Sequence, residues 1–206
     1  MKNPEQPKLA AVLLAAGGSS RLGQSKQLVE VDGVSLARRT AELLLGLEIV
    51  SLTVVTGCCS DEVLCEIESL AVDAVVNSGW RKGLGGSIAH GVRGIPGEVD
   101  GLMLMLCDQW RVDRTDLMRL VHLWQQDVSQ VCVSSWRSGN ALASGPPVIF
   151  PRHLIPKLKG LKNKDGAKPV IENYSRVKRV EIENAAFDLD TPEDLEALIS
   201  RSAQPR

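Results

Sequence analysis

A short apolar run followed at once by glycines and basic residues constrains this chain more than any other feature. Residues 9–14 have the length and bulk of a buried strand. The following segment, residues 15–26, reads AAGGSSRLGQSK and includes Arg21 and Lys26. Glycines permit a tight turn and let backbone N–H groups approach an anion, and the two cations add charge to those dipoles. We interpret the segment as a loop that binds a triphosphate.

Two common phosphate-binding motifs do not fit this loop. Gly18 and Gly23 have the glycine spacing of a Walker A loop, but Gln24 and Ser25 follow, and the lysine comes late, at Lys26. The glycine spacing also does not supply the G-x-G-x-x-G fingerprint of dinucleotide-binding folds. The alternative to a phosphate site is an ordinary strand-to-helix loop with solvated basic residues.

Composition limits the class of protein. With 206 residues, 44% of them hydrophobic, the chain has material for one domain over 1–206, with its core at about 8–200. A formal charge of −1 gives no basic face for nucleic acid. The five cysteines form no zinc-like C-x-x-C pair, which favours reduced thiols in the cytoplasm. No apolar run approaches the roughly 18 residues of a membrane span, so we expect a soluble protein without a membrane partner.

Apolar β-branched runs alternate with amphipathic stretches along the chain. We expect strands at 9–14, 51–56, 71–76, 101–107 and 130–134, an edge strand at 177–182, and helices at 35–47, 61–70, 113–126 and 154–160. A further helix is expected to begin near Ser87, capped by its hydroxyl, and residues 135–150 have the turn-rich pattern of a hairpin. This alternation predicts an α/β fold with a parallel sheet and ligands at the carboxyl ends of its strands.

Three aspartates suggest a metal site at that edge of the sheet. Asp108 ends the apolar run 101–107, where a carboxylate is well placed to hold Mg²⁺ beside a nucleotide's phosphates. Asp188 and Asp190 precede a helix that Thr191 is expected to cap. Two carboxylates so close together are most easily explained by a shared cation, and we rank Asp190 above Asp188 as its ligand. The alternative for Asp108 is a turn or cap residue.

The loop sequence LAAGGSSRLGQSKQL, the later Leu-Cys-Asp-Gln and the run FDLDTPEDL resemble the nucleotidyltransferases that attach a nucleotide to the pterin of the molybdenum cofactor. The cytidylyl-transferring branch is the most similar, because members of the guanylyl-transferring branch commonly carry Ala-Gly-Gly at residues 15–17. The resemblance implies a three-layer α/β/α Rossmann-like fold of the glycosyltransferase-A type with a mostly parallel central sheet. Trp110 departs from the family, which usually has proline there.

The resemblance also implies roles for individual residues. Catalysis is assigned to Arg21, Lys26 and Asp108, and the Mg²⁺ ion to Asp108 and Asp190. The nucleotide is expected to contact Leu14, Ala15, Ala16, Gly17, Gly18, Ser19, Lys26, Gly86 and Ser87. The acceptor is expected near Trp136, Gly145, Lys168 and Asp188. A tryptophan in a strand more often serves packing, and Lys168 has the alternative of an ordinary surface lysine.

The resemblance therefore implies transfer of CMP from CTP to molybdopterin with release of pyrophosphate. The substrates are then CTP or GTP and molybdopterin, and the resemblance adds a molybdoenzyme or its chaperone as a protein partner. Three alternatives stay open. They are guanylyl transfer from GTP to the same cofactor, transfer to a sugar- or polyol-phosphate, and a non-catalytic chaperone that binds the molybdenum cofactor.

Overall fold

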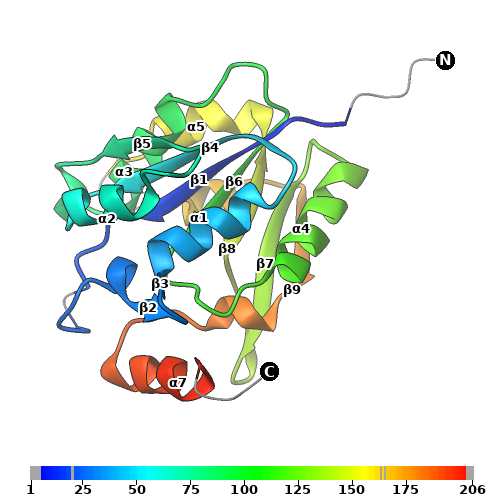
Figure 1. Ribbon diagram of the computed structural model, residues 1–206. Helices are drawn as coiled ribbons and strands as arrows, with labels where there is room; N and C mark the ends of the chain where they lie inside the picture. Colours follow the sequence, from blue (N-terminus) through cyan, green and yellow to red (C-terminus); the bar gives the residue numbers. More distant parts are fainter. Residues whose placement is uncertain (1–5, 20, 163, 165, 203–206) are drawn as a thin grey trace.

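A seven-stranded sheet runs through the centre of the protein in the computed structural model, which describes residues 6–19, 21–162, 164 and 166–202 (Figure 1). Its strand order is β5-β4-β1-β6-β8-β7-β9. The strands are β1 (Leu9–Ala15), β4 (Ile49–Thr56), β5 (Asp73–Val76), β6 (Gly101–Leu106), β7 (Val131–Ser138), β8 (Ala141–Pro151) and β9 (Val177–Glu181). A separate two-stranded ribbon joins β2 (Glu30–Val31) to β3 (Val34–Ser35).

Most of the central sheet is parallel. β5, β4, β1 and β6 run parallel to one another, and β9 runs parallel to β7. β8 is antiparallel to its neighbours β6 and β7. The register sets Leu14 opposite Leu106 and Ala15 opposite Thr56, so the loops after β1, β4 and β6 leave the same edge of the sheet.

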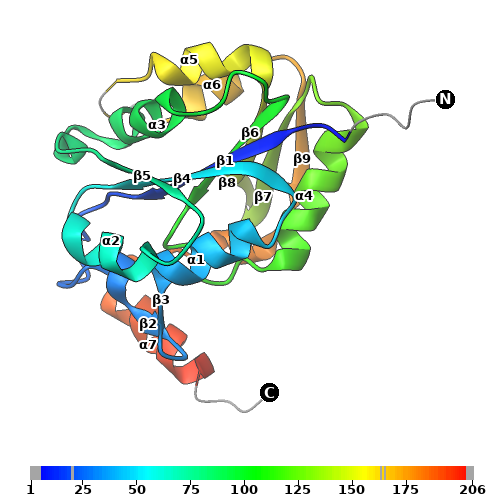
Figure 2. The same cartoon turned by 45° about the horizontal axis from the view of Figure 1, so that its top comes forward.

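Helices cover both faces of the sheet (Figure 2). One layer contains α1 (Leu36–Leu45), α2 (Ser60–Ile67) and α4 (Arg114–Gln126), and the other contains α3 (Leu84–Arg93), α5 (Ile155–Lys159) and α6 (Lys168–Glu172). The last helix is α7 (Pro192–Ser202), and short 3₁₀ turns are η1 (Lys26–Leu28), η2 (Trp80–Lys82), η3 (Arg152–Leu154) and η4 (Glu183–Ala186). The predicted three-layer α/β fold is therefore confirmed.

Burial on both faces explains why the central strands are apolar throughout. Every residue of β1 is buried, with alternate side chains entering the core of either helical layer. Burying a leucine or valine side chain contributes about 1.5–3 kcal/mol relative to leaving it exposed. The buried strand therefore fixes the position of the loop that follows it.

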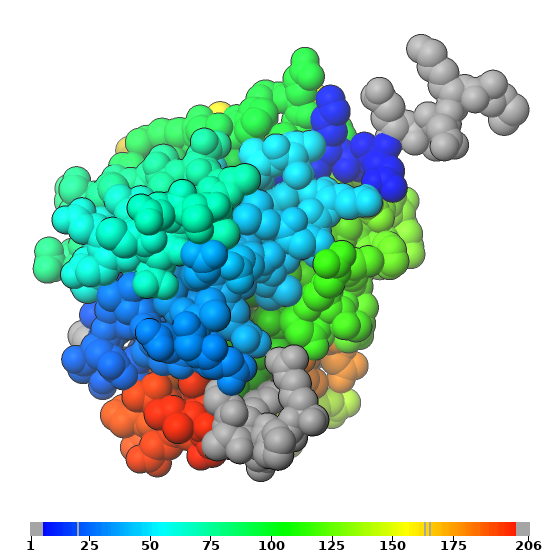
Figure 3. Space-filling model, in the orientation of Figure 1, coloured from blue at the N-terminus to red at the C-terminus, as the bar shows by residue number. Residues whose placement is uncertain are grey.

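A third, smaller core lies away from the two main ones and was not predicted. It joins the β2–β3 ribbon, the segment after β6 and α7, and we call it the tail core. Figure 3 shows the orange-to-red C-terminal segment directly beside the blue residues that follow the first loop. Its buried members are Leu22, Val29, Val31, Leu36, Trp110, Leu189 and Leu198. Trp110, where the family usually has proline, is thus a packing residue of the tail core.

The predicted elements recur with shifted ends, apart from one error. The hairpin at 135–150 and the edge strand at 177–182 are confirmed as β7–β8 and β9. The helix expected near Ser87 begins at Leu84 instead, and the Ser87 hydroxyl accepts a hydrogen bond from the Asn77 side chain rather than capping backbone N–H groups. The glycines at 85 and 86 concealed this start because glycine disfavours helix interiors. Within the described residues, each helix is too short or too polar to cross a bilayer.

Candidate active site

The loop after β1 forms one wall of a cavity of about 360 Å³. Leu14 and Ala16 line it from the end of β1, and Leu106 and Asp108 line it from the end of β6. The opposite wall comes from η2 and the start of α3. The cavity therefore lies at the carboxyl ends of adjacent parallel strands, where the sequence predicted a ligand site.

Glycine at position 18 is required by a close contact across this cavity. A Cβ atom at Gly18 would overlap the far edge of the Trp80 ring. Gly57, which follows β4, is equally close-packed, since a Cβ there would lie 2.8 Å from the Ala16 carbonyl oxygen and 2.8 Å from the Trp80 Cβ. The Arg81 guanidinium lies 4.5 Å above the Trp80 ring. Three loops thus pack together tightly around the indole.

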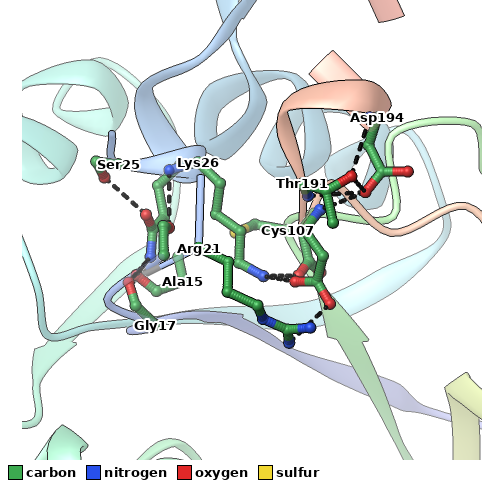
Figure 4. Close-up of polar contacts among 12 residues, drawn as sticks. Ala15, Gly17, Arg21, Ser25, Lys26, Cys107, Thr191 and Asp194 are labelled. Carbon is green, nitrogen blue, oxygen red and sulfur yellow. Dashed lines mark hydrogen bonds and ion pairs between the residues drawn. The ribbon is translucent and has the colours of Figure 1, made fainter. Parts of the chain in front are cut away.

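A lysine amine joins two acidic loops beside the cavity (Figure 4). The Lys26 Nζ donates to Asp108 Oδ2 and, at 3.1 Å, to Asp190 Oδ1. Arg21 donates to the second Asp190 oxygen at 3.3 Å from a largely exposed position. Residues separated by 82 and 164 positions in the chain from Lys26 are therefore brought onto one cation.

A backbone hydrogen bond and a stacked arginine side chain hold the two acidic loops together. The Leu189 N–H donates to the Asp108 carbonyl at 3.0 Å. The Arg111 guanidinium stacks on Trp110 at 4.7 Å and on Phe187 at 3.6 Å, which ties the loop after β6 to the segment before α7. Because Asp188 and Asp190 flank Leu189, these contacts place both carboxylates near Asp108.

The cap of α7 adds to this arrangement. Asp194 Oδ2 accepts from the N–H groups of Asp190 and Thr191 at 3.0 and 2.8 Å, and the Thr191 hydroxyl accepts from the Asp194 N–H at 3.2 Å. The predicted Thr191 cap is confirmed. Since the cap also fixes the Asp190 backbone, the start of α7 orients a carboxylate of the site.

The ionisation of these groups follows from burial and from their mutual charges. Burial works to lower the pKa of Lys26, but the Asp108 carboxylate and then Asp190 outweigh it and hold that pKa above its usual value. For Asp188, burial raises the pKa to about 7, and the charges of Asp108 and Asp190 add to the rise. Asp188 therefore binds its proton more tightly than an exposed aspartate, while Lys26 stays charged beside Asp108 and Asp190.

The donor set fits a hard divalent cation. Among the described residues, no three His, Cys, Asp or Glu side chains are already arranged around a common metal position. However, Mg²⁺ commonly takes only one or two protein carboxylates and completes its shell with water and substrate phosphates. Asp108 Oδ1 and Asp188 Oδ1 are buried without a hydrogen-bond partner. Buried, unpartnered carboxylate oxygens are the ligands such an ion prefers, and Asp108 and Asp190 already share one cation.

A buried amide organises the wall that faces the loop. Asn77 is 1% exposed, donates to the Ser87 hydroxyl at 3.0 Å and accepts from the Gly79 N–H at 3.0 Å. Ser87 itself lines the cavity, whereas Gly86 does not. The amide therefore fixes the rotamer of the Ser87 hydroxyl.

The structure brings most of the predicted nucleotide residues to one place. Those that line the cavity are Leu14, Ala16, Gly17, Gly18, Lys26 and Ser87, and the predicted metal ligand Asp108 lines it with them. Ala15 is fully buried behind it, and the Ser19 hydroxyl accepts from the Lys26 N–H at 3.0 Å. These two residues shape the loop from outside the cavity wall.

The residues predicted for the acceptor are scattered. Asp188 lies beside the other aspartates, and Trp136 packs partly buried on a main core, where its ring would lie 3.1 Å from a Cβ at Gly145. The Lys168 side chain is 82% exposed, pairs with Glu172 at 3.7 Å and does not line the cavity. The structure therefore groups Trp136 with Gly145 but sets Lys168 apart.

Among the cavity residues to which the sequence analysis gave no individual role, Gln27 and Trp80 shape the loop after β1. Gln27 is fully buried and its amide donates to the carbonyl oxygens of Ala15 and Gly17, which holds the loop in shape. Trp80 covers Gly18. The sequence did hold a signal for Gln27. It is the last polar residue of the loop, directly before the apolar Leu28 and Val29, and this position favours a side chain that turns inward.

Comparisons with known proteins place this arrangement in context. The chain is 27% identical to the purine catabolism protein PucB of Bacillus subtilis over 202 residues, which cover 91% of this chain and 94% of PucB. It is also 27% identical to the nicotine blue oxidoreductase of Paenarthrobacter nicotinovorans over 172 residues, covering 82% of this chain and 84% of that protein. The two names describe different activities, so they assign no single reaction.

Solved structures support the fold. The crystal structure of Rv0371c from Mycobacterium tuberculosis H37Rv superposes with a TM-score of 0.79 at 23% identity, covering 95% of this chain and 99% of that one. A manganese complex of Rv0371c gives a TM-score of 0.76 at 21% identity, with 94% and 98% coverage. The family model described as the MobA-like NTP transferase domain matches residues 11–179. The chain therefore belongs to the MobA-like NTP transferase family and has the predicted Rossmann-like nucleotidyltransferase fold.

Proposed function

We propose that this chain transfers the cytidylyl group of CTP to the terminal phosphate of molybdopterin and releases pyrophosphate. The observation that carries the proposal is the Lys26 amine, which Asp108 and Asp190 hold at the glycine-lined cavity. A carrier protein needs no cation and paired carboxylates beside a phosphate-sized loop. This arrangement supports a transferase over a non-catalytic chaperone of the molybdenum cofactor.

The chemistry asks for positioning and charge stabilisation. An oxygen of the acceptor phosphate forms a bond to the α-phosphorus of CTP in line, and the bond from that phosphorus to the pyrophosphate oxygen breaks. Lys26 is placed to stabilise the negative charge that develops on the phosphates, and Arg21 to approach the leaving group from the exposed side. Backbone groups of residues 16–18 line the space for the phosphates. No side-chain nucleophile is required.

Asp108 and Asp190 are proposed to hold a divalent cation, Mg²⁺ in the cell. When bound, such an ion neutralises phosphate charge and orients the phosphates. Lys26 would then share both carboxylates with the ion and keep its charge beside the substrate phosphates. The manganese complex of the structurally similar Rv0371c supports a divalent ion in this fold.

The choice of CTP over GTP is proposed from Ala16 and Ser87. Ala16 lines the cavity at the position where the guanylyl-transferring branch commonly has glycine. Ser87 presents a hydroxyl that Asn77 holds in place, which suits hydrogen bonding to the edge of a small base. We expect Ala16→Gly to widen the cavity and move preference from CTP toward GTP. The measurement is the rise in melting temperature with each nucleotide, and the ratio of the CTP value to the GTP value should fall in the variant.

The acceptor and the recipient of the product complete the proposal. Molybdopterin is preferred to a sugar- or polyol-phosphate because the segments around Trp136–Gly145 and Asp188 resemble those that face the pterin in the family. The product then passes to a molybdoenzyme or its chaperone in the cytoplasm. The pyrophosphate assay tests the acceptor by comparing molybdopterin with the two other acceptor classes.

The test is an endpoint and rate assay of pyrophosphate. The purified chain is incubated with Mg²⁺, reduced molybdopterin and either CTP or GTP, with parallel reactions that contain methylerythritol phosphate or a sugar phosphate as acceptor. We expect release that requires both CTP and molybdopterin, and a cytidylylated pterin in the mass spectrum. Thermal shifts with CTP and with GTP measure base preference independently of the acceptor.

Several results would contradict the proposal. Faster release with GTP would assign guanylyl transfer, and release with a sugar- or polyol-phosphate alone would assign another acceptor. Tight binding of molybdopterin without pyrophosphate from either nucleotide would favour the chaperone. Omission of the divalent ion is expected to abolish release, and unchanged release in its absence would remove the roles of Asp108 and Asp190 as metal ligands.

A further inference from the structure

Two adjacent thiols lie beside the cavity and have no part in the proposed transfer. Cys58 and Cys59 follow β4 and precede α2, at the same edge of the sheet as the glycine-rich loop. Both are half-buried and unbridged, and their Sγ atoms lie 3.6 Å apart. The remaining cysteines differ, because Cys107 and Cys132 are buried and Cys65 is exposed on α2.

The backbone at this pair is unusual for its residue type. Cys59 has φ 54° and ψ 43°, in the left-handed region that residues other than glycine seldom occupy. Gly57 alone separates the pair from the end of β4, and Cys59 is followed directly by Ser60, the first residue of α2. The pair is therefore held in a tight turn.

This turn contacts the cavity wall through its backbone. The Cys58 N–H donates to the Ala16 carbonyl at 3.2 Å. Gly57 packs so closely on Ala16 and Trp80 that a Cβ atom would lie within 2.8 Å of each. Ala16 and Trp80 both line the cavity. A change in the peptide between Cys58 and Cys59 therefore acts on two residues of the nucleotide site.

We propose that Cys58 and Cys59 are a redox modification site at which a low-molecular-weight disulfide, such as glutathione disulfide, forms a vicinal disulfide and weakens nucleotide binding. The thiolate of one cysteine attacks a sulfur of glutathione disulfide, whose S–S bond breaks and releases one glutathione. The second cysteine thiolate then attacks the protein sulfur of the mixed disulfide and releases the other glutathione. Two protein thiols are oxidised, one glutathione disulfide is reduced, and the two protons pass to the glutathione thiolates.

The distances explain why closure disturbs the turn. The two sulfurs must approach from 3.6 Å to about 2.05 Å, the length of a disulfide bond. Both Cα atoms belong to one peptide unit, so the approach twists that unit rather than moving two independent segments. The Cys58 N–H belongs to the preceding peptide unit, which shares the Cys58 Cα atom, so the twist passes through that atom and draws the N–H away from the Ala16 carbonyl.

Adjacency also makes the modification reversible. Neighbouring Cα atoms are about 3.8 Å apart across a trans peptide, below the roughly 4.4–6.8 Å that most disulfides span. Such strained bonds are readily reduced and are typical of regulatory rather than structural disulfides. The pair therefore acts as a switch that thiol reductants reset.

The test combines mass spectrometry with nucleotide affinity. The reduced full-length chain is treated with glutathione disulfide, remaining thiols are alkylated, and cleavage after Glu62 separates the pair from Cys65. We expect the peptide that contains Cys58 and Cys59 to lose two hydrogens and take up no alkylating agent. The dissociation constant for CTP is expected to rise about tenfold, and dithiothreitol should restore both properties.

Matched variants identify the thiols responsible. Cys58→Ser and Cys59→Ser should each bind CTP as the reduced chain does and lose the response to glutathione disulfide, whereas Cys65→Ser should keep it. A stable glutathione adduct, a disulfide that includes Cys65, or a vicinal disulfide with unchanged CTP affinity would each overturn the proposal.

The affinity readout rests on the proposed function, but the mass readout does not. A reduced chain that binds neither CTP nor GTP would contradict the proposed function and the effect on binding together. Failure of the two thiols to join, in a chain that does bind CTP, would contradict only the redox site. The two failures are therefore distinguishable.

Discussion

The carboxylates at the two ends of the central sheet differ in how fully their oxygens are hydrogen-bonded. At the amino end, Asp127 accepts hydrogen bonds from residues close to it in the sequence. The donors are the Ser129 N–H at 3.0 Å, the Ser129 hydroxyl at 2.6 Å and the Gln130 side-chain amide at 2.6 Å. Arg176 adds an ion pair at 2.6 Å. At the carboxyl end, Asp108 retains a buried oxygen with no partner and relies on Lys26, far away in the sequence.

The difference separates a structural carboxylate from a functional one. The Ser129 hydroxyl, followed by Gln130, holds the pKa of Asp127 at about 2, so this group is satisfied within its own turn. Asp108 and Asp188 are instead held with unmet hydrogen-bonding capacity. Locally unsatisfied groups in an otherwise consistent fold are expected where a ligand completes them.

Removing the Lys26 amine, which Asp108 and Asp190 share, should have the largest effect on the transfer rate and test the contrast between the two ends of the sheet most directly. Lys26→Ala is expected to lower the transfer rate at least about 100-fold, equivalent to about 3 kcal/mol of transition-state stabilisation, because no other cation lies between the two carboxylates in the described structure. Steady-state pyrophosphate release measures it.

The matched control is Lys178→Ala, on the exposed edge strand β9, which should leave the rate unchanged. An undiminished rate for Lys26→Ala would show that the carboxyl end of the sheet is not the reacting site.

The opposite end of β6 should respond in stability instead. A Cβ atom at Gly101 would overlap the fully buried ring of Trp124. Overpacking of this kind costs about 1–3 kcal/mol, so Gly101→Ala is expected to lower the free energy of unfolding by that amount in urea titrations.

Gly94→Ala, which meets open space, is its control. Folded Gly101→Ala should still bind CTP with wild-type affinity. A loss of CTP affinity in the folded variant would break the separation between the two ends.

A third substitution tests the cavity wall without touching a charge. Gly18→Ala is expected to displace the Trp80 ring and raise the dissociation constant for CTP about tenfold, or about 1.4 kcal/mol, in calorimetric titrations. Gly97→Ala, whose Cβ meets nothing nearby, should bind normally. If both variants bind alike, the contact between Gly18 and Trp80 has no role in shaping the site.

The smallest effect is expected at Asp127 and depends on pH. Its folded pKa of about 2 lies below the unfolded value of about 3.9, so its stabilisation is present above about pH 4 and is lost as pH falls toward 2. Asp127→Ala should therefore melt slightly lower than the wild type at pH 7 and match it near pH 2. Its transfer rate should be unchanged. A melting difference that persists at pH 2 would contradict the assignment.

Sequence patterns predicted the sheet and its covering layers because the determining signals are local. The fully apolar runs of β1 and β6 indicate strands buried on both faces, and the Thr191–Asp194 pattern indicates a helix start. The common edge of the sheet then follows from chain alternation. This is why Lys26 and Asp108 could be expected together before any geometry was known.

The missed features depend on contacts between distant segments. Nothing local marks Trp80 as the cover of Gly18 or Trp110 as a member of the tail core, because each tryptophan finds its partners only after the chain has folded. The two-residue strands β2 and β3 are likewise too short to show a period. The start of α3 was misplaced because Gly85 and Gly86 have low helix propensity, although both lie in the first turn of the helix and Gly85 is buried there.

The tail core couples ligand binding at the cavity to the stability of the C-terminal helix. Leu189 is buried there beside residues of α7, while its N–H binds the Asp108 carbonyl and its neighbour Asp190 binds Lys26. Docking of the last helix and closure of the acidic pair are thus thermodynamically linked, and linkage is reciprocal. Ligands that draw Asp108 and Asp190 together should therefore protect the C-terminal helix from proteases and from amide hydrogen exchange. In turn, a protein that binds this helix should change the affinity of the site for its substrate.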